Sequence, residues 1–536
     1  MKPFSASDYS LRHIGSLIVG YCLVWTLIQW LSEPNLDSYH DMLENYAWSY
    51  QWEWGTFKHP PFFSWTVGAW FFLFETTDFS YKLFAYVNVA LALMAVAVLA
   101  KQLKLTHLAL TAVLLLLWSF PYSTLAAKFN ANSQLLPLWP WTAVVFLYCT
   151  QAVGWQRLLA SVLLGLMAAA CMLSKYFSGV FLLSFVVILL AHSHTSLWLK
   201  SAWPYVALMT FVLAMYPHYQ WLASHDFITW VYAQAQTEAR IDWPRIFKFA
   251  VMPLVYWLPA WLVCAALFAV LNPQTRSMRQ KTQAFLRNSV VCWRAQGWQD
   301  TLFWLCAVPW LSTLLICVIT RVSPEAPWAI PMGFAYTLLW LRNLSQQHPA
   351  HTPRVLNRLA QWRWQALAWI ALVAAAITLY WAWVPRANLN YYRPTQIAAL
   401  HIASEWHREH PTEPLGWSSG SWGENAMVGF YANHHVKALP NLPDSAESLI
   451  APLTDWQKQG GVIVCPLGTE DQPQDHAQAC VRDTQQWLVA LGQSEQPRTY
   501  ALAKTGTRYP QQVIFRYAVF HYLPAIPSHT SQPTQP

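Results

Sequence analysis

Long apolar runs recur through most of this chain, and they constrain its fold more than any other sequence feature. A helix needs about 20 apolar residues to cross a bilayer core of about 30 Å, because lipid cannot pair the backbone polar groups of an irregular segment. The runs lie near residues 14–31, 80–100, 107–123, 133–150, 157–173, 176–192, 202–219, 247–271, 301–319, 327–342 and 364–384. They predict a polytopic α-helical membrane protein with about 11 transmembrane helices.

The composition excludes several other classes of protein. Charged residues make up 11% of the 536 residues, less than half of the roughly 25% that is usual in a soluble domain. The 34 Trp, 24 Tyr and 26 Phe agree with the enrichment of aromatic rings at lipid headgroups. The net charge of +8 does not indicate a nucleic-acid partner, because Lys and Arg lie in short loops rather than in one stripe. A soluble globular enzyme, a disordered chain and a disulfide-rich scaffold are therefore excluded.

The basic loops predict the orientation. Lys and Arg gather in loops near residues 276–294 and 342–363, with smaller groups at 101–104, 157 and 200, and such loops usually face the cytoplasm. If the N-terminus is cytoplasmic, all of these basic loops face the cytoplasm. The first run follows Lys2 and Arg12 without a small-residue cleavage site, so we expect it to be retained as an anchor. An odd number of spans then places the tail in the periplasm of a bacterium and the chain in its inner membrane.

The chain changes character near residue 390. We expect a transmembrane domain over residues 1–390, a small periplasmic α/β domain over 391–522, and a disordered tail over 523–536. Short apolar runs at 461–465 and 513–515 resemble strands, and the stretches near 421–432 and 476–491 resemble helices. Cys465 and Cys480 both lie in this exported part, where an oxidising compartment allows a disulfide. The sequence leaves open whether they form one.

The loop between the first two runs, residues 32–79, contains the densest polar chemistry. Asp41 is a candidate general base there. The loop continues into Lys58-His59-Pro60-Pro61 and an aromatic stretch to about residue 75, which is too short for a span and is typical of a helix in the membrane interface. Pro is tolerated in a first turn, so we expect Pro60 and Pro61 to begin that helix. A carboxylate and cations are thus predicted at headgroup depth, where a reaction on a lipid-linked substrate needs them.

Several basic residues lie on the predicted outer side, although Lys and Arg prefer the cytoplasmic side. They are Lys58, His59, Lys82, Arg240, Arg245, Lys248 and Arg321. Fixed cations stabilise charge that develops on a phosphate leaving group, so phosphate binding is one explanation. The alternatives are ordinary ones. A juxtamembrane Lys or Arg snorkels to lipid phosphates, a loop acid such as Asp37 or Glu53 caps a helix or is solvated, and the Trp residues form an aromatic belt. The residues by themselves indicate an outer face that carries candidate catalytic groups, but they do not identify a reaction.

At the first loop the sequence resembles a known family. The order Asp41…Trp48…Trp54-Gly55…Lys58-His59-Pro60-Pro61 is similar to the bacterial branch of the dolichyl-phosphate-mannose–protein mannosyltransferase family, which includes the lipid A aminoarabinose transferases. Further matches lie at 174–176, 216–221, 225–226 and 321–331, and in the tail around 431 and 462–464. Two positions depart from the family. Met42 follows Asp41 where Glu is usual, and Asn132 lies in a stretch that often contains an Asp.

The resemblance implies the glycosyltransferase C fold, with interfacial helices in the first periplasmic loop. It also implies transfer of a sugar from a polyprenyl phosphate, with undecaprenyl phosphate as the expected carrier, to a lipid, glycan or protein acceptor at the periplasmic face. Asp41 would be the general base that activates the acceptor hydroxyl. The implied donor-phosphate ligands are Lys58, His59, Lys175, Arg240 and Arg321, and the implied substrate contacts are Glu44, Tyr46, Trp54 and Asn132.

Some questions stay open at this point. Glu44 lies one helical turn after Asp41 and is placed to compensate for Met42. No metal ligand is assigned, and whether a divalent metal bridges Asp41 and the phosphate is open. A secondary transporter or lipid flippase is one rival function, although such proteins usually carry ionisable groups inside their spans, whereas these predicted spans are nearly free of charge. An inactive relative that binds a lipid-linked sugar is the other.

Overall fold

The computed structural model of the chain describes residues 11–32, 35–37, 40–50, 52–192, 198–235, 241–383, 392–421, 423–432, 434–439, 441–444, 455–469, 477–493, 496–504 and 513–524. The chain divides into two compact units. Unit 1 consists of Met1–Leu31, Trp54–Thr66 and Phe79–Thr378, and unit 2 consists of Ser32–Glu53, Val67–Asp78 and Leu379–Pro536. The predicted first loop is therefore divided: its Asp41 segment belongs to unit 2 and its Lys58 segment to unit 1.

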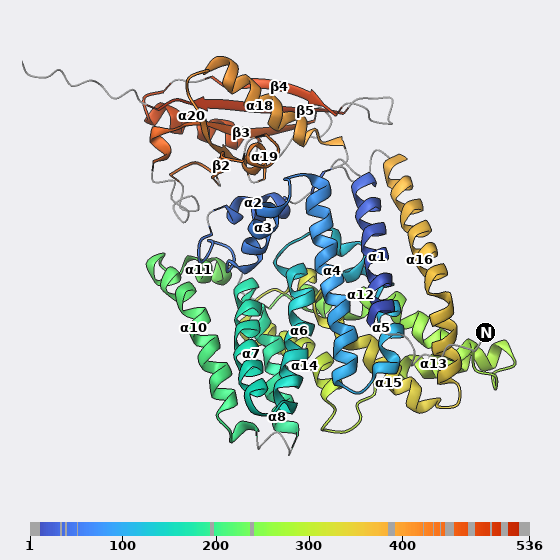
Figure 1. Ribbon diagram of the computed structural model, residues 1–536. Helices are drawn as coiled ribbons and strands as arrows, with labels where there is room; N and C mark the ends of the chain where they lie inside the picture. The colour runs from blue at the N-terminus through green and yellow to red at the C-terminus, as the bar shows by residue number, and fades with distance from the viewer. Residues whose placement is uncertain are drawn as a thin grey trace, which may run out of the picture. The chain divides into compact units, whose positions relative to one another are not determined.

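Unit 1 is built from helices (Figure 1). They are α1 (Leu11–Ser32), α4 (Asp78–Gln102), α5 (Ala109–Leu116), α6 (Ala131–Gln151), α7 (Gly154–Ser174), α8 (Gly179–Ala191), α10 (Trp203–Ser224), α11 (Ile228–Ala235), α12 (Trp243–Val270), α13 (Met278–Val291), α14 (Thr301–Thr320), α15 (Tyr336–Gln347) and α16 (Thr352–Trp383). A continuous apolar core joins most of these helices and fully buries Trp139, Trp257 and Trp340. α10 packs closely along α7 because Gly165 has no side chain: a Cβ there would lie 2.4 Å from the carbonyl oxygen of Ala207.

Five of the described helices are long and apolar enough to cross a membrane, namely α1, α4, α7, α12 and α14. The segments Thr106–Leu116 and Phe120–Ala127 meet at 84° and count as a sixth span if they form one. The prediction of a mostly helical membrane protein with several apolar helices is confirmed, whereas the total of about 11 spans stays a prediction. Helices α6 and α10 have 21 and 22 residues, contain proline inside the helix, and are not among these five.

Two predicted runs are not continuous helices. The run near 107–123 bends after α5, and Pro121 follows the bend. The run near 327–342 consists of the 3₁₀ turns Ala326–Ala329 and Met332–Ala335 followed by α15. Pro331 precedes the second turn. Gly333 lies directly against Trp257, and a Cβ added at Gly333 would lie 2.2 Å from the Trp257 ring. Hydropathy alone does not reveal such breaks, because the residues that cause them are themselves apolar.

Unit 2 contains a five-stranded sheet of order β2-β1-β3-β5-β4. The strands are β1 (Leu415–Gly420), β2 (Lys437–Ala438), β3 (Gly460–Thr469), β4 (Arg498–Ala503) and β5 (Ile514–Tyr522); β1 pairs in parallel with β2 and β3, and β5 is antiparallel to β3 and β4. The helices of its C-terminal part are α18 (Thr395–Glu409), α19 (Glu424–Tyr431) and α20 (Ala477–Ala490). A disulfide between Cys465 and Cys480 joins β3 to α20. The predicted small α/β domain is confirmed.

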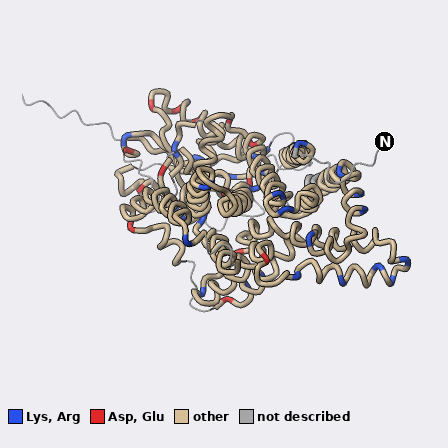
Figure 2. The backbone as a smooth tube through the Cα atoms, turned by 60° about the horizontal axis from the view of Figure 1, so that its bottom comes forward, with Lys and Arg blue, Asp and Glu red and all other residues tan. Residues whose placement is uncertain are grey.

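Two helices from the first loop complete the description. α2 (Asp41–Ser49) belongs to unit 2, and α3 (Phe62–Leu73) begins in unit 1 and ends in unit 2. The helix predicted after Pro60 and Pro61 is confirmed, because α3 begins at the next residue. Among the described residues, Lys and Arg are spread over many helices and loops (Figure 2).

Candidate active site

The Trp54-Gly55-Thr56 segment of unit 1 is attached to α10 and α11. The Trp54 carbonyl oxygen lies 2.5 Å from Nδ1 of the buried His218. Two residues further on, the Thr56 carbonyl accepts a hydrogen bond of 2.6 Å from the Thr229 hydroxyl. Between them Gly55 lies on the Trp221 ring, and a Cβ at Gly55 would lie 2.2 Å from Trp221 Cε3. Only glycine therefore allows this approach.

A tight turn then presents Lys58 and His59. The Thr56 hydroxyl accepts from the His59 N–H at 2.9 Å and from the Lys58 N–H at 3.3 Å, and the Thr56 N–H donates to the His59 carbonyl at 3.0 Å. The His59 ring packs edge-on against Phe63, with centroids 5.7 Å apart. Because Trp54, Gly55 and Thr56 are held on α10 and α11, the turn after them has a defined position.

Lys175 forms the second part of the cluster. It follows the last residue of α7 in an extended conformation, and its Nζ donates to Asn132 Oδ1 at 2.7 Å. The same Nζ lies 5.3 Å from the Trp328 ring centroid, within range of a cation–π interaction. Asn132 stands near the start of α6, where Asn130 caps the helix through the N–H groups of Asn132 and Ser133. Residues from three predicted motifs, around 130, 175 and 328, are thus brought together.

The electrostatics of this cluster favour an anion. Burial, followed by the positive charges of Lys175 and Lys58, lowers the pKa of His59 well below its ordinary value. The His59 imidazole is therefore neutral at neutral pH and acts as a hydrogen-bonding group rather than a cation. The two lysines supply the positive charge.

The other predicted cations of unit 1 are placed differently. Arg321 is exposed and adopts a left-handed conformation at the end of α14, with φ 60°. Lys82 is buried and donates to the carbonyl of Gln29, at 3.2 Å, which fastens α4 to α1. Arg245 pairs with Asp242 and Glu325 at 3.3 and 3.6 Å. Arg240 lies outside the described residues.

In unit 2, Asp41 is the first residue of α2 and is half-buried. Asp37 caps this helix: its two carboxylate oxygens accept from the backbone N–H groups of Asp41, at 3.0 Å, and Met42, at 2.9 Å. The helix-cap alternative for Asp37 is therefore confirmed.

The residue before Asp41 is fixed by the C-terminal part of unit 2. His40 has a left-handed backbone, with φ 59°, and packs on Gly423. Arg393 donates to His40 Nε2 at 2.6 Å and lies 3.5 Å from the buried carboxylate of Glu424, at the start of α19. These contacts hold the start of α2 against α19, so the α/β part of unit 2 sets the position of Asp41.

Glu44 and Tyr46 lie on the same helix as Asp41, and both are buried. The Tyr46 ring packs against Phe71 and Phe430, and its hydroxyl contacts Tyr50 and His434 Nδ1, the latter at 3.2 Å. Tyr46 is thus a packing residue within unit 2, and its predicted contact with substrate stays a prediction. Trp54, by contrast, is 40% exposed and keeps an open ring surface.

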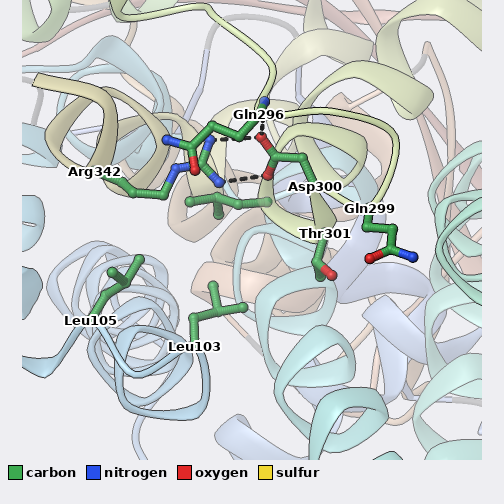
Figure 3. Close-up of a pocket in the computed structure, with 8 residues that line it drawn as sticks. Leu103, Leu105, Gln296, Gln299, Asp300, Thr301 and Arg342 are labelled. Carbon is green, nitrogen blue, oxygen red and sulfur yellow. Dashed lines mark hydrogen bonds and ion pairs between the residues drawn. The ribbon is translucent and has the colours of Figure 1, made fainter. Parts of the chain in front are cut away.

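A cavity of about 240 Å³ lies elsewhere in unit 1 (Figure 3). Its lining comes from the loop after α4, the segment before α14 and the side of α15, where Arg342 binds both carboxylate oxygens of Asp300 at 2.5 and 2.7 Å. The predicted site residues do not line it. Asp300 is buried and Arg342 is half-buried, and this ion pair stabilises the junction of α14 and α15.

The sequence alone gives no sign of the individual contacts of His218 and Asn130. His218 links Tyr176, at 2.5 Å from its Nε2, to the carbonyl of Trp54. The signal in the sequence was a polar residue, His218, on an otherwise apolar helix. It does not identify the partners of His218, because they lie 42 and 164 residues away.

Comparisons with known proteins agree with the resemblance predicted from the first loop. Residues 58–221 match the family model of dolichyl-phosphate-mannose-protein mannosyltransferase. This stretch includes Lys58, Asn132, Lys175 and His218. The predicted resemblance is thereby confirmed. A search among curated proteins finds no match to this chain.

Two crystal structures share the fold. ArnT from Cupriavidus metallidurans bound to undecaprenyl phosphate is 14% identical, with a TM-score of 0.56 over 96% of this chain and 98% of that one. The apo state of the same protein is 14% identical, with a TM-score of 0.53 over 94% and 98%. The predicted glycosyltransferase C fold is therefore confirmed.

Proposed function

We propose that this chain, which matches the dolichyl-phosphate-mannose–protein mannosyltransferase family over residues 58–221 and shares the fold of ArnT, is a membrane glycosyltransferase. It transfers a sugar from a polyprenyl phosphate, undecaprenyl phosphate in a bacterium, to a lipid, glycan or protein acceptor. The reaction takes place at the periplasmic face of the inner membrane, with the N-terminus in the cytoplasm. The undecaprenyl phosphate bound to ArnT supports the choice of carrier.

The cluster of Lys58, His59 and Lys175 carries this proposal. Two lysines lie close enough to a half-buried histidine to lower its pKa, and Lys175 is held by Asn132 and Trp328. A phosphate placed here receives charge-assisted hydrogen bonds from the lysines and a neutral hydrogen bond from His59. As the bond between the sugar and the phosphate breaks, the lysines stabilise the charge that develops on the leaving polyprenyl phosphate.

Asp41 is the proposed general base. Its carboxylate takes the proton of the acceptor hydroxyl while the oxygen attacks the anomeric carbon, on the side opposite to the phosphate, so the configuration inverts. A base of this kind contributes about 10²–10⁴-fold to the rate. Trp54 and Asn132 are proposed to contact the sugar, Glu44 to support Asp41, and Arg240 and Arg321 to add positive charge near the phosphate.

Binding of undecaprenyl phosphate to the detergent-purified full chain tests the phosphate site. We expect Lys175→Ala to weaken binding by roughly 10- to 100-fold, the loss typical of a hydrogen bond to a charged group. Lys200→Ala, at an exposed residue outside the site, is the matched control and should bind like the wild type. Equal affinities of the wild type and Lys175→Ala would refute the phosphate site.

Turnover tests the role of Asp41. With labelled undecaprenyl-phosphate sugars and envelope lipids or proteins as acceptors, Asp41→Asn should bind the carrier but release polyprenyl phosphate about 10²–10⁴-fold more slowly. Glu75→Gln, in the exposed end of the same loop, should keep its activity. An Asp41→Asn variant that turns over at the wild-type rate would exclude this base. Uptake of a solute into vesicles without a glycosyl product would support the transporter alternative.

A further inference from the structure

A group of metal-ligand side chains lies in unit 2, outside the first loop. Glu409 ends α18, His410 follows it, and His521 lies near the end of β5. His410 Nε2 and His521 Nδ1 are 3.1 Å apart, and Glu409 Oε2 is 3.6 Å from His521 Nδ1. One ligand atom from each of the three residues lies within 4.8 Å of the others.

We propose that Glu409, His410 and His521 bind a zinc ion. Two imidazoles and one carboxylate are a common zinc ligand set, and zinc bonds of about 2.0–2.1 Å in a tetrahedron place neighbouring ligand atoms about 3.3–3.4 Å apart. The distances of 3.1 and 3.6 Å lie on either side of that value. Small side-chain movements are therefore enough to place all three atoms around one ion.

The surroundings orient these ligands. The Trp406 ring packs against both imidazoles, with centroids 4.7 Å from His410 and 5.1 Å from His521, and its indole N–H donates to the carbonyl of Glu413 at 2.9 Å. His521 is buried on the sheet, which fixes its Nδ1 on the side of α18. The C-terminal end of α18 also carries partial negative charge, which favours a cation at this position.

Arg498 is the main competing group. Its guanidinium donates to Glu409 Oε2, with Nε at 2.9 Å, and Arg408 lies 3.6 Å from Glu409 Oε1. Carboxylates that bind metals are normally hydrogen-bonded by a second group, so Arg498 is compatible with the site. Its positive charge weakens the attraction for a divalent cation, and we therefore expect a site of lower affinity than a cysteine-rich zinc site.

Zinc at this position joins α18 to β5. α18 begins at Thr395 and β5 ends at Tyr522, so the ion cross-links two elements that are distant in the sequence. Glu409 is at the surface, and the fourth coordination position is therefore open to water. The inference does not depend on the proposed glycosyltransferase function.

The test uses the detergent-purified full chain, freed of metals with a chelator and titrated with Zn²⁺. We expect one equivalent of zinc to bind and to raise the thermal unfolding midpoint, and Co²⁺ to give the visible absorption of a tetrahedral nitrogen–oxygen site. His410→Ala should lose both effects. His407→Ala, at an exposed position on the same helix, should retain them.

His521→Ala is a second variant, and the loss of zinc in either histidine variant supports the site if that variant folds. His410 is only partly buried, so His410→Ala remains informative even if His521→Ala does not fold. Zinc binding that is equal in the wild type and His410→Ala would overturn the proposal, as would a wild-type chain that binds no zinc.

Discussion

Replacing Gly55 with alanine tests how the first loop is held on α10. The new Cβ would lie 2.2 Å from Trp221 Cε3 and 2.3 Å from Cζ3, which is far inside van der Waals contact. Trp221 cannot easily move, because it is 6% exposed and stacks on His225 with ring centroids 4.2 Å apart. Overpacking of this kind costs about 1–3 kcal/mol. The loop should therefore shift away from α10, and the turn that carries Lys58 and His59 should shift with it.

Thermal unfolding in detergent and binding of undecaprenyl phosphate measure the two consequences of Gly55→Ala. We expect a lower unfolding midpoint and weaker carrier binding. Removing the ring in the double variant Gly55→Ala/Trp221→Leu should recover part of the loss, with a coupling free energy of about 1–3 kcal/mol. Gly15→Ala is the matched control, because its Cβ would meet only Met94 Cε at 3.7 Å. Wild-type stability and carrier affinity in Gly55→Ala would refute the reasoning.

Three further predictions concern other parts of the molecule. Burial raises the pKa of Asp300, but hydrogen bonds from Arg342 and from backbone N–H groups outweigh it and hold the pKa below its ordinary value. The stabilisation is therefore complete above the ordinary pKa of about 3.9 and is lost as the pH falls through the folded-state pKa. Asp300→Asn should remove this acid dependence, measured as the unfolding midpoint against pH, and should cost about 3–5 kcal/mol as a broken buried pair. Replacing Cys465 and Cys480 with alanine opens a 15-residue loop and should destabilise unit 2 by about 3 kcal/mol in chemical denaturation; an unchanged transition would contradict this. Glu424→Gln should reduce kcat more than carrier affinity, because it releases the start of α2 and with it Asp41, and a KM effect alone would count against that role.

Much of the helical architecture could be predicted from the sequence, because hydropathy is a local property that directly reports burial in lipid. The breaks near Pro331 and Gly333 could not be predicted from hydropathy, and Gly333 is needed there because the Trp257 ring packs against it. It also missed β1, whose Leu-Gly-Trp-Ser-Ser-Gly sequence is typical of a loop. That segment forms a strand because β2 and β3 pair with it on both sides.

The features of the candidate site also fall into two groups, those that could be predicted from the sequence and those that could not. The sequence pointed separately to Trp54-Gly55, to Lys175 and to residues 216–221. Their contacts depend on partners far away in the chain, 43 residues for the Lys175–Asn132 bond and 164 residues for the His218–Trp54 contact. The helix-cap alternative for Asp37 could be stated from the sequence, since its partners are the neighbouring N–H groups of α2. The neutral state of His59 could not be predicted, because its lowered pKa depends first on burial and then on the charge of Lys175, which is distant in the chain.

The sequence by itself determined the membrane class, the family resemblance, the helix that follows Pro60 and Pro61, and the α/β character of the C-terminal part. These features depend on composition and on the order of neighbouring residues. Only the tertiary structure decided which basic side chains form structural contacts and that His59 is neutral. It also decided that the Asp41 helix belongs with the C-terminal part. Charge state and position depend on groups that approach through space, and no local pattern encodes those distances.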